Sequence, residues 1–240
     1  MDISKYTRIA RKALKLRHCG AVIVAAGSAS RMGGIDKVMA PLKGEPMIVH
    51  TVRAFQECDA IREIVIVTRP DLIQPIANLT RDMTKVRAVV AGGASRQDSV
   101  ALGLNTLSDK VELAAIQDGA RPLVTWQLID RVVRAANSYG GAVPVIPVKD
   151  TIKVTDSALV ISTPDRSTLR AVQTPQVFDF DLLRAAMKKV QEEGLEVTDD
   201  CSAVEQLGFK VKIVEGDERN LIVTTPFDLK VAEMLMEEEK

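Results

Sequence analysis

Residues 21–37, AVIVAAGSASRMGGIDK, decide the fold of this 240-residue chain. The apolar run Ala21–Val24 predicts a buried parallel strand, and the small residues after it let the backbone approach a ligand closely. Successive N–H groups in such a loop form a concave site for anions. Two cations, Arg31 and Lys37, flank a glycine pair and suit a polyphosphate. The stretch therefore predicts a nucleotide-triphosphate site where a strand ends. The alternative is an ordinary strand-to-helix turn with two surface cations.

Two better-known phosphate loops are excluded at this position. A P-loop needs Gly-Lys-Ser/Thr at a fixed spacing, and the dinucleotide fingerprint needs Gly-x-Gly-x-x-Gly. The loop has neither pattern, but reads Ala-Ala-Gly-x-x-x-Arg-Met followed by Asp36-Lys37. The sequence therefore predicts a nucleotide loop of a different kind.

The composition favours one large α/β domain. Hydrophobic residues make up 46% and aromatic residues 3% of the chain, and 32 basic residues balance 32 acidic ones. A nucleic-acid-binding protein would be basic and would offer aromatic platforms for stacking, so we expect no nucleic-acid partner. No run approaches the roughly 20 apolar residues of a membrane span, so we expect no membrane insertion.

The cysteines and histidines exclude several kinds of site. Cys19, Cys58 and Cys201 show neither a disulfide framework nor zinc-ligand spacing, which predicts a reducing, cytoplasmic location. His18 and His50 are the only histidines, and neither has the neighbours of a Ser/His/Asp hydrolase.

The chain divides into an N-terminal extension, residues 1–19, and one domain, residues 20–240. The extension holds six cations and one acid, with apolar residues at helical spacing. We expect a basic amphipathic helix that packs on the domain or trails from it; contact with an anionic membrane surface is the alternative.

Apolar runs alternate with amphipathic stretches along the domain, as in stacked strand–helix units. We expect strands at 21–25, 63–68, 86–91, 113–117 and 142–148, with further candidates at 171–178, 211–215 and 220–224. Helices should lie between them, with Pro46 at a first helical position, Ser95 and Asp98 as a capping box, Thr125 and Gly140 at the two ends of one helix, and Thr225-Pro226 opening the last one. The pattern predicts a Rossmann-like α/β fold: a mostly parallel sheet with helices on both faces.

Residues 149–170 break this rhythm. Two alternating runs meet at Asp156-Ser157, which predicts a β-hairpin arm inserted into the core. The edges of a protruding hairpin need a cover, and a second subunit is the simplest one. We therefore expect the arm to take part in dimerisation.

Two further loops follow predicted strands, at the edge where ligands of open α/β sheets collect. Gly92-Gly93 precedes a capped helix and could bind a phosphate or a base edge, although such turns are also common without function. Asp118 could orient a hydroxyl or a hydrated Mg²⁺. Arg121 could bind a phosphate or hold Asp118 in place, the latter being a purely structural ion pair.

Several ordered blocks extend this pattern: AAGSASRM, AGGASRQDSV, QDGARPLV, VKDTIK, QTPQVF, TDDCSAVE and VEGDERNLIVTTPFDL. From about residue 20 to 236 the chain resembles the 2-C-methyl-D-erythritol 4-phosphate cytidylyltransferase family, which has a GT-A-like nucleotidyltransferase fold. The resemblance implies that CTP and 2-C-methyl-D-erythritol 4-phosphate give the CDP-alcohol and pyrophosphate in non-mevalonate isoprenoid biosynthesis. It also implies a homodimer, and Mg²⁺ held mainly by the CTP phosphates without direct protein ligands.

The resemblance assigns roles by position. Residues implied to hold CTP are Ala25, Ala26, Gly27, Gly93, Ala94 and Ser99; the catalytic cations are Arg31, Lys37 and Arg166; and the polyol phosphate would be held by Asp118, Gly119, Arg121, Thr151, Arg166, Thr174 and Thr198. Because the family's hairpin crosses a two-fold axis, Thr151 and Arg166 would serve the partner subunit's site.

Three positions depart from the family pattern. Ile222 stands where a lysine is usual, Gln117 replaces the histidine before Asp118, and Val38 replaces the glutamine after Lys37. The loss of the lysine's charge leaves two alternatives open: a cytidylyltransferase for another polyol phosphate such as ribitol 5-phosphate, or a CTP-binding protein with weak catalysis.

Overall fold

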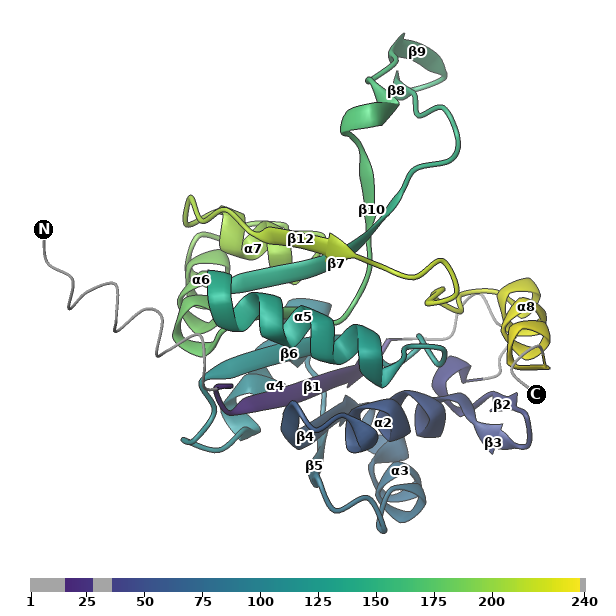
Figure 1. Cartoon of the computed structure of the whole chain (residues 1–240), viewed down its shortest axis with the longest axis vertical. Helices are drawn as coiled ribbons and strands as arrows, with labels where there is room; N and C mark the ends of the chain where they lie inside the picture. The colour runs from purple at the N-terminus through teal and green to yellow at the C-terminus, as the bar shows by residue number, and fades with distance from the viewer. Residues whose placement is uncertain (1–15, 28–35, 238–240) are drawn as a thin grey trace, which may run out of the picture.

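A computed structural model describes residues 16–27 and 36–237, and an α/β sandwich occupies most of them (Figure 1). Its central sheet has eight strands in this described part of the chain. Their order is β10 (Arg170–Val172), β7 (Gly141–Pro147), β11 (Gln176–Asp179), β6 (Leu113–Asp118), β1 (Cys19–Ala25), β4 (Ile61–Thr68) and β5 (Val86–Ala91), with β12 (Lys212–Glu215) paired to β7.

The core of the sheet is parallel. β1 pairs in parallel with β4 and β6, β4 with β5, and β12 with β7, whereas β11 and β10 run antiparallel to their neighbours. Strands β4 and β5 add to one side of β1 and β6 to the other, so the strand order reverses at β1. This reversal leaves a crevice at the carboxyl ends of the strands.

Two strand expectations need correction. The predicted strand 171–178 is two strands, β10 and β11, because Pro175 between them has no N–H to donate to a ladder. The predicted strand 220–224 is wrong: this segment joins no sheet. Val223 is buried in another way: it packs in a small core beside α8, and its N–H donates to Ala120 O.

Helices cover both faces of the sheet (Figure 1). One face carries α2 (Met47–Glu57), α3 (Ile73–Leu79) and α5 (Trp126–Tyr139); the other carries α4 (Arg96–Thr106), α6 (Phe180–Glu192) and α7 (Asp200–Glu205). Within β1, Ala21 and Ile23 face the first layer and Val22 faces the second, as strand alternation requires. Burial on both faces explains why the strand is a continuous apolar run.

The remaining elements are short. They are the strands β2 (Pro41–Leu42) and β3 (Glu45–Pro46), the 3-10 helices η1 (Lys37–Met39), η2 (Pro70–Leu72) and η3 (Arg166–Thr168), and the last helix α8 (Pro226–Glu237). α8 packs against β2.

The predicted helix ends are confirmed with one shift. Ser95 and Asp98 form the capping box of α4, Thr125 Oγ1 accepts from Leu128 N, and Gly140 ends α5 with φ of 83°. Pro46 lies one residue earlier than expected, at the N-cap of α2, because it pairs in β3.

The predicted arm forms a two-stranded antiparallel sheet, β8 (Val154–Asp156) and β9 (Leu159–Ser162), which stands away from the body (Figure 1). Leu159, Val160 and Ile161 on β9 are 71%, 60% and 62% exposed. Three consecutive exposed apolar residues make β9 an unusual solvent-facing strand. The hairpin is confirmed, and its role in dimerisation stays a prediction.

Most of the predicted N-terminal helix, residues 1–15, lies outside the described residues. The described end of this extension is tied to the body, because Arg17 pairs with Asp179 at 2.7 Å. Bilayer crossing needs a longer and more apolar helix than any in the described part of the chain.

Candidate active site

A cavity of about 500 Å³ lies at the carboxyl ends of β1, β5 and β6. It occupies the crevice at the point where the strand order reverses. Nine residues expected at the site line it: Ala25, Ala26, Gly27, Lys37, Gly93, Ala94, Ser99, Asp118 and Gly119. The loops after three separate strands therefore meet around one space, as the sequence predicted.

The glycine loop after β5 packs too closely for larger residues. A Cβ on Gly92 would lie 2.5 Å from the Ala26 Cβ, and one on Gly93 would lie 2.3 Å from the Asp98 Cβ. Gly93 N donates to Ser99 Oγ at 3.2 Å, and Ser99 Oγ donates to Ser95 O at 3.0 Å. These contacts hold the loop against the first turn of α4, where backbone N–H groups and the helix dipole favour an anion.

Lys37 brings a positive charge to the cavity from η1. Asp36 caps this turn, since its Oδ1 accepts from Val38 N at 3.0 Å. Val38 is buried beneath the turn. Lys37 therefore lies in a short turn that the Asp36 cap and the buried Val38 side chain hold in place.

Asp118 and Arg96 line the cavity, and Arg121 and Asp200 pair with them from outside its lining. Arg121 Nε lies 3.3 Å from Asp118 Oδ2, and Arg96 Nη2 lies 3.8 Å from Asp118 Oδ1. Arg96 also donates two hydrogen bonds to Asp200, from Nη1 to Oδ1 at 3.0 Å and from Nη2 to Oδ2 at 2.6 Å. Burial raises the pKa of Asp200, and the Arg96 guanidinium opposes that shift. Two arginines thus flank the Asp118 carboxylate, one at each oxygen.

Two of the predicted polyol-binding residues contact Asp118. Arg121 is buried, and its Nη1 donates to Asn220 O at 2.7 Å. Thr174 is also buried, and its Oγ1 accepts from Asp118 N at 3.2 Å. Both side chains therefore fix the strand end that carries Asp118; substrate contact by either stays a prediction.

The other predicted residues lie elsewhere. Thr151 and Arg166 are exposed and do not line the cavity of the same chain. The arm to which they belong stands away from the body (Figure 1). Thr198 is exposed just before α7. Arg31 falls within residues 28–35 and lies outside the described residues.

The sequence reasoning gave no role to Arg96 or Asp200, and it gave Ser95 only a capping role. Arg96 and Ser95 line the cavity, and Asp200 is fully buried against Arg96. Their signals were present: Arg96 opens the helix after the glycine loop, and Asp200 lies in the family-like block TDDCSAVE. Ile222 and Val38, two of the three positions that depart from the family pattern, also line the cavity.

The donor set does not form a metal cage. Within residues 16–27 and 36–237, no group of three or more His, Cys, Asp or Glu side chains could hold a metal ion. Among the described residues that line the cavity, Asp118 is the only acid. One carboxylate suits a Mg²⁺ that keeps most of its ligands as substrate phosphates and water.

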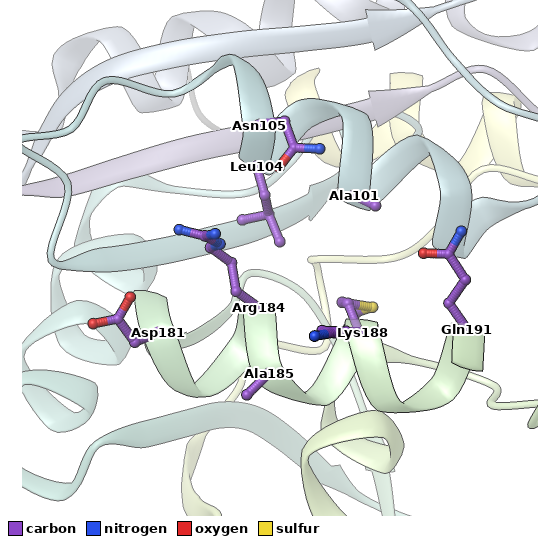
Figure 2. A pocket seen from close by; sticks show the side chains of 9 residues that line it. Ala101, Leu104, Asn105, Asp181, Arg184, Ala185, Lys188 and Gln191 are labelled. Carbon is purple, nitrogen blue, oxygen red and sulfur yellow. The ribbon is translucent and has the colours of Figure 1, made fainter. Parts of the chain in front are cut away.

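A second cavity of about 400 Å³ lies between α4 and α6 (Figure 2). Its charged lining consists of Asp181, Arg184 and Lys188 on α6. Among the described residues, none from the loops after β1, β5 or β6 lines this cavity. We therefore take the cavity at the sheet edge, and not this one, as the candidate active site.

The fold and the sheet-edge cavity define the chain as an α/β nucleotidyltransferase. Comparison with known proteins is more specific: the model of the 2-C-methyl-D-erythritol 4-phosphate cytidylyltransferase family matches residues 19–238. The chain belongs to this family.

Curated relatives match this chain over almost its whole length. The 2-C-methyl-D-erythritol 4-phosphate cytidylyltransferase of Caldanaerobacter subterraneus subsp. tengcongensis is 44% identical over 221 residues, covering 90% of this chain and 97% of the relative. That of Bacillus velezensis is 44% identical over 224 residues, covering 91% and 95%.

Solved structures agree with the fold. The crystal structure of 4-diphosphocytidyl-2C-methyl-D-erythritol synthase from Anaerococcus prevotii matches with a TM-score of 0.84 at 29% identity, covering 94% of this chain and 98% of that one. The 2-C-methyl-D-erythritol 4-phosphate cytidylyltransferase from Thermus thermophilus matches with a TM-score of 0.76 at 33% identity, covering 90% and 98%.

Proposed function

We propose that the protein transfers the cytidylyl group of CTP to 2-C-methyl-D-erythritol 4-phosphate, a step of non-mevalonate isoprenoid precursor biosynthesis. The observation that carries the proposal is the meeting of three loops, from β1, β5 and β6, around one cavity in a chain of this family. Family membership supplies the substrates, and the cavity supplies a place for them.

The reaction needs positioning and charge stabilisation. A phosphate oxygen of the alcohol phosphate attacks the α-phosphorus of CTP, a new P–O bond forms, and the bond to the β-phosphate oxygen breaks to release pyrophosphate. Two anions must meet, so preorganised cations and backbone N–H groups provide most of the catalysis. No histidine is required.

The predicted site residues divide between the two substrates. Ala25, Ala26, Gly27, Gly93, Ala94 and Ser99 would hold CTP, with Arg31 and Lys37 on its phosphates. Asp118 and Gly119 would face the alcohol phosphate, with Arg121, Thr174 and Thr198 around them. Bound Mg²⁺ would neutralise part of the triphosphate charge, and Asp118 is the described carboxylate able to reach it or a water on it.

The arm would complete the site of a second subunit. Thr151 and Arg166 stand away from their own cavity, and the apolar side chains of β9 are exposed. A homodimer in which each arm covers the partner would bury these side chains and bring the Arg166 charge to the partner's alcohol phosphate.

The three free cysteines support a reducing, cytoplasmic location.

The arm yields a direct prediction. The double variant Leu159→Asp/Ile161→Asp should convert the dimer to monomer, because the two side chains share one strand face and burying two carboxylates is costly. Analytical ultracentrifugation measures the mass. The control is Leu79→Asp, at an exposed apolar residue of α3, which should stay dimeric. A monomeric wild type, or a dimer that survives both changes, would contradict the role of the arm.

A substrate panel tests the activity. The kcat/KM for pyrophosphate release should be at least about 100-fold higher with CTP than with ATP, GTP or UTP. A site that hydrogen-bonds the edge of one base leaves buried polar groups unpaired when another base binds. 2-C-methyl-D-erythritol 4-phosphate should be preferred to ribitol 5-phosphate although Ile222 lines the cavity. Faster turnover of ribitol 5-phosphate would overturn the assigned alcohol, and CTP binding without turnover of either would overturn the activity.

A further inference from the structure

Lys37 depends on a very short element for its position. It begins η1, a 3-10 helix of three residues, and η1 has few backbone hydrogen bonds of its own: Met39 N donates to Asp36 O at 3.1 Å and Ala40 N to Lys37 O at 3.3 Å. A lysine side chain is long and rotates freely. The direction of its ammonium group therefore depends on what holds the turn.

Asp36 holds the turn with both carboxylate oxygens. Oδ1 accepts the capping hydrogen bond from Val38 N, while Oδ2 lies 2.5 Å from Arg69 Nη1. The Asp36 side chain is 15% exposed and the Arg69 side chain 32%, so this ion pair is partly shielded from water. A partly shielded ion pair contributes more than a fully exposed one.

Arg69 is itself fixed. It directly follows β4, whose last residue, Thr68, is buried in the sheet. Its Nε and Nη2 donate to Asp71 Oδ1 and Oδ2 at 3.1 and 2.8 Å. One guanidinium thus bridges two carboxylates, and it ties η1 to the carboxyl end of a central strand.

We propose that Arg69 is a positioning residue for cytidylyl transfer, which acts through Asp36 to hold Lys37 against the phosphates of CTP. The inference rests on the proposed function. Arg69 does not line the cavity, so its effect on the reaction must pass through the turn. Misplacement of a catalytic group by about 1 Å can cost about 100-fold in rate, whereas the buried Val38 limits the movement of this turn. We therefore expect a loss of about 10-fold.

Two variants separate the ion pair from the cap. Asp36→Asn keeps an oxygen that can accept from Val38 N but removes the charge that pairs with Arg69; Arg69→Ala removes the other partner. Both should lower kcat about 10-fold with KM for the alcohol phosphate within about 2-fold of wild type, and Arg69→Lys should recover part of the loss. The matched control is Arg134→Ala, at an exposed arginine paired with Asp130 on α5, which should change nothing.

A double-mutant cycle with Lys37→Ala decides the mechanism. If Arg69 acts through Lys37, Arg69→Ala should cost less than about 2-fold further in the Lys37→Ala background. Losses that multiply, or an unchanged kcat for Arg69→Ala, would overturn the inference. If the wild type shows no turnover, the proposed function fails separately, and the same cycle is then run on the Kd of CTP by calorimetry, where additive effects would again overturn it.

Discussion

Lys37→Ala should lower kcat for cytidylyl transfer about 10²–10³-fold while KM for 2-C-methyl-D-erythritol 4-phosphate changes little. Lys37 lines the cavity beside the loop after β1, where the triphosphate is proposed to lie. Negative charge on the phosphates shifts toward the leaving pyrophosphate during the reaction, so a fixed cation stabilises the transition state more than the bound substrates. Steady-state pyrophosphate release measures both constants.

The matched control for this variant is Lys43→Ala. Lys43 lies six residues further along the chain and pairs with Glu237, outside the cavity lining. It should keep the wild-type kcat. If Lys37→Ala instead raised KM for the alcohol phosphate with kcat unchanged, the lysine would belong to the alcohol site, and the assignment would be wrong.

Arg96→Met should destabilise the fold by about 3–5 kcal/mol, because it leaves the buried Asp200 carboxylate without a counter-charge. For a chain of this size such a loss lowers Tm by on the order of 10 °C. Asp200→Asn should cost less, since Arg96 is 31% exposed and water can reach its charge. Urea unfolding of both variants measures the difference.

The loss of stability in Arg96→Met should depend on pH. Burial raises the pKa of Asp200, and the Arg96 guanidinium works against that shift, so without Arg96 the folded-state pKa rises further above its unfolded value. The folded variant then binds a proton more tightly than the unfolded chain, and lowering the pH from 8 to 5 should shrink its deficit relative to wild type.

The double variant Arg96→Met/Asp200→Leu is the control for this account. Because it removes both charges, it should recover most of the stability. A deficit that is the same at both pH values, or no recovery in the double variant, would contradict the account of this pair.

The parts of the site that lie within one short stretch of sequence could be predicted. The apolar run of β1, the small residues after it and the capped helix after Gly93 each leave a local pattern, and all three meet at the cavity. Contacts between distant residues leave no such pattern. Arg96 and Asp200 are 104 residues apart, and only the fold of α4 against α7 shows that they pair.

Burial explains the remaining differences. Residues 220–224 are apolar enough for a strand, but Val223 satisfies that pattern by packing with the residues around α8. Arg121 and Thr174 carry groups suited to a phosphate, yet both are buried and hydrogen-bonded around Asp118. A residue type indicates what a side chain can bind; its burial decides how far a ligand can reach it.

The most direct test of the central claim is ³¹P NMR of wild-type protein with CTP, Mg²⁺ and 2-C-methyl-D-erythritol 4-phosphate. The account predicts that the γ-phosphate signal of CTP and the monoester signal disappear together, and that inorganic pyrophosphate and the paired signals of a CDP-alcohol replace them in equal amounts. Two results would contradict the account. In one, the monoester signal persists and CTP is unchanged; in the other, the monoester signal persists while CTP breaks down to CDP and inorganic phosphate.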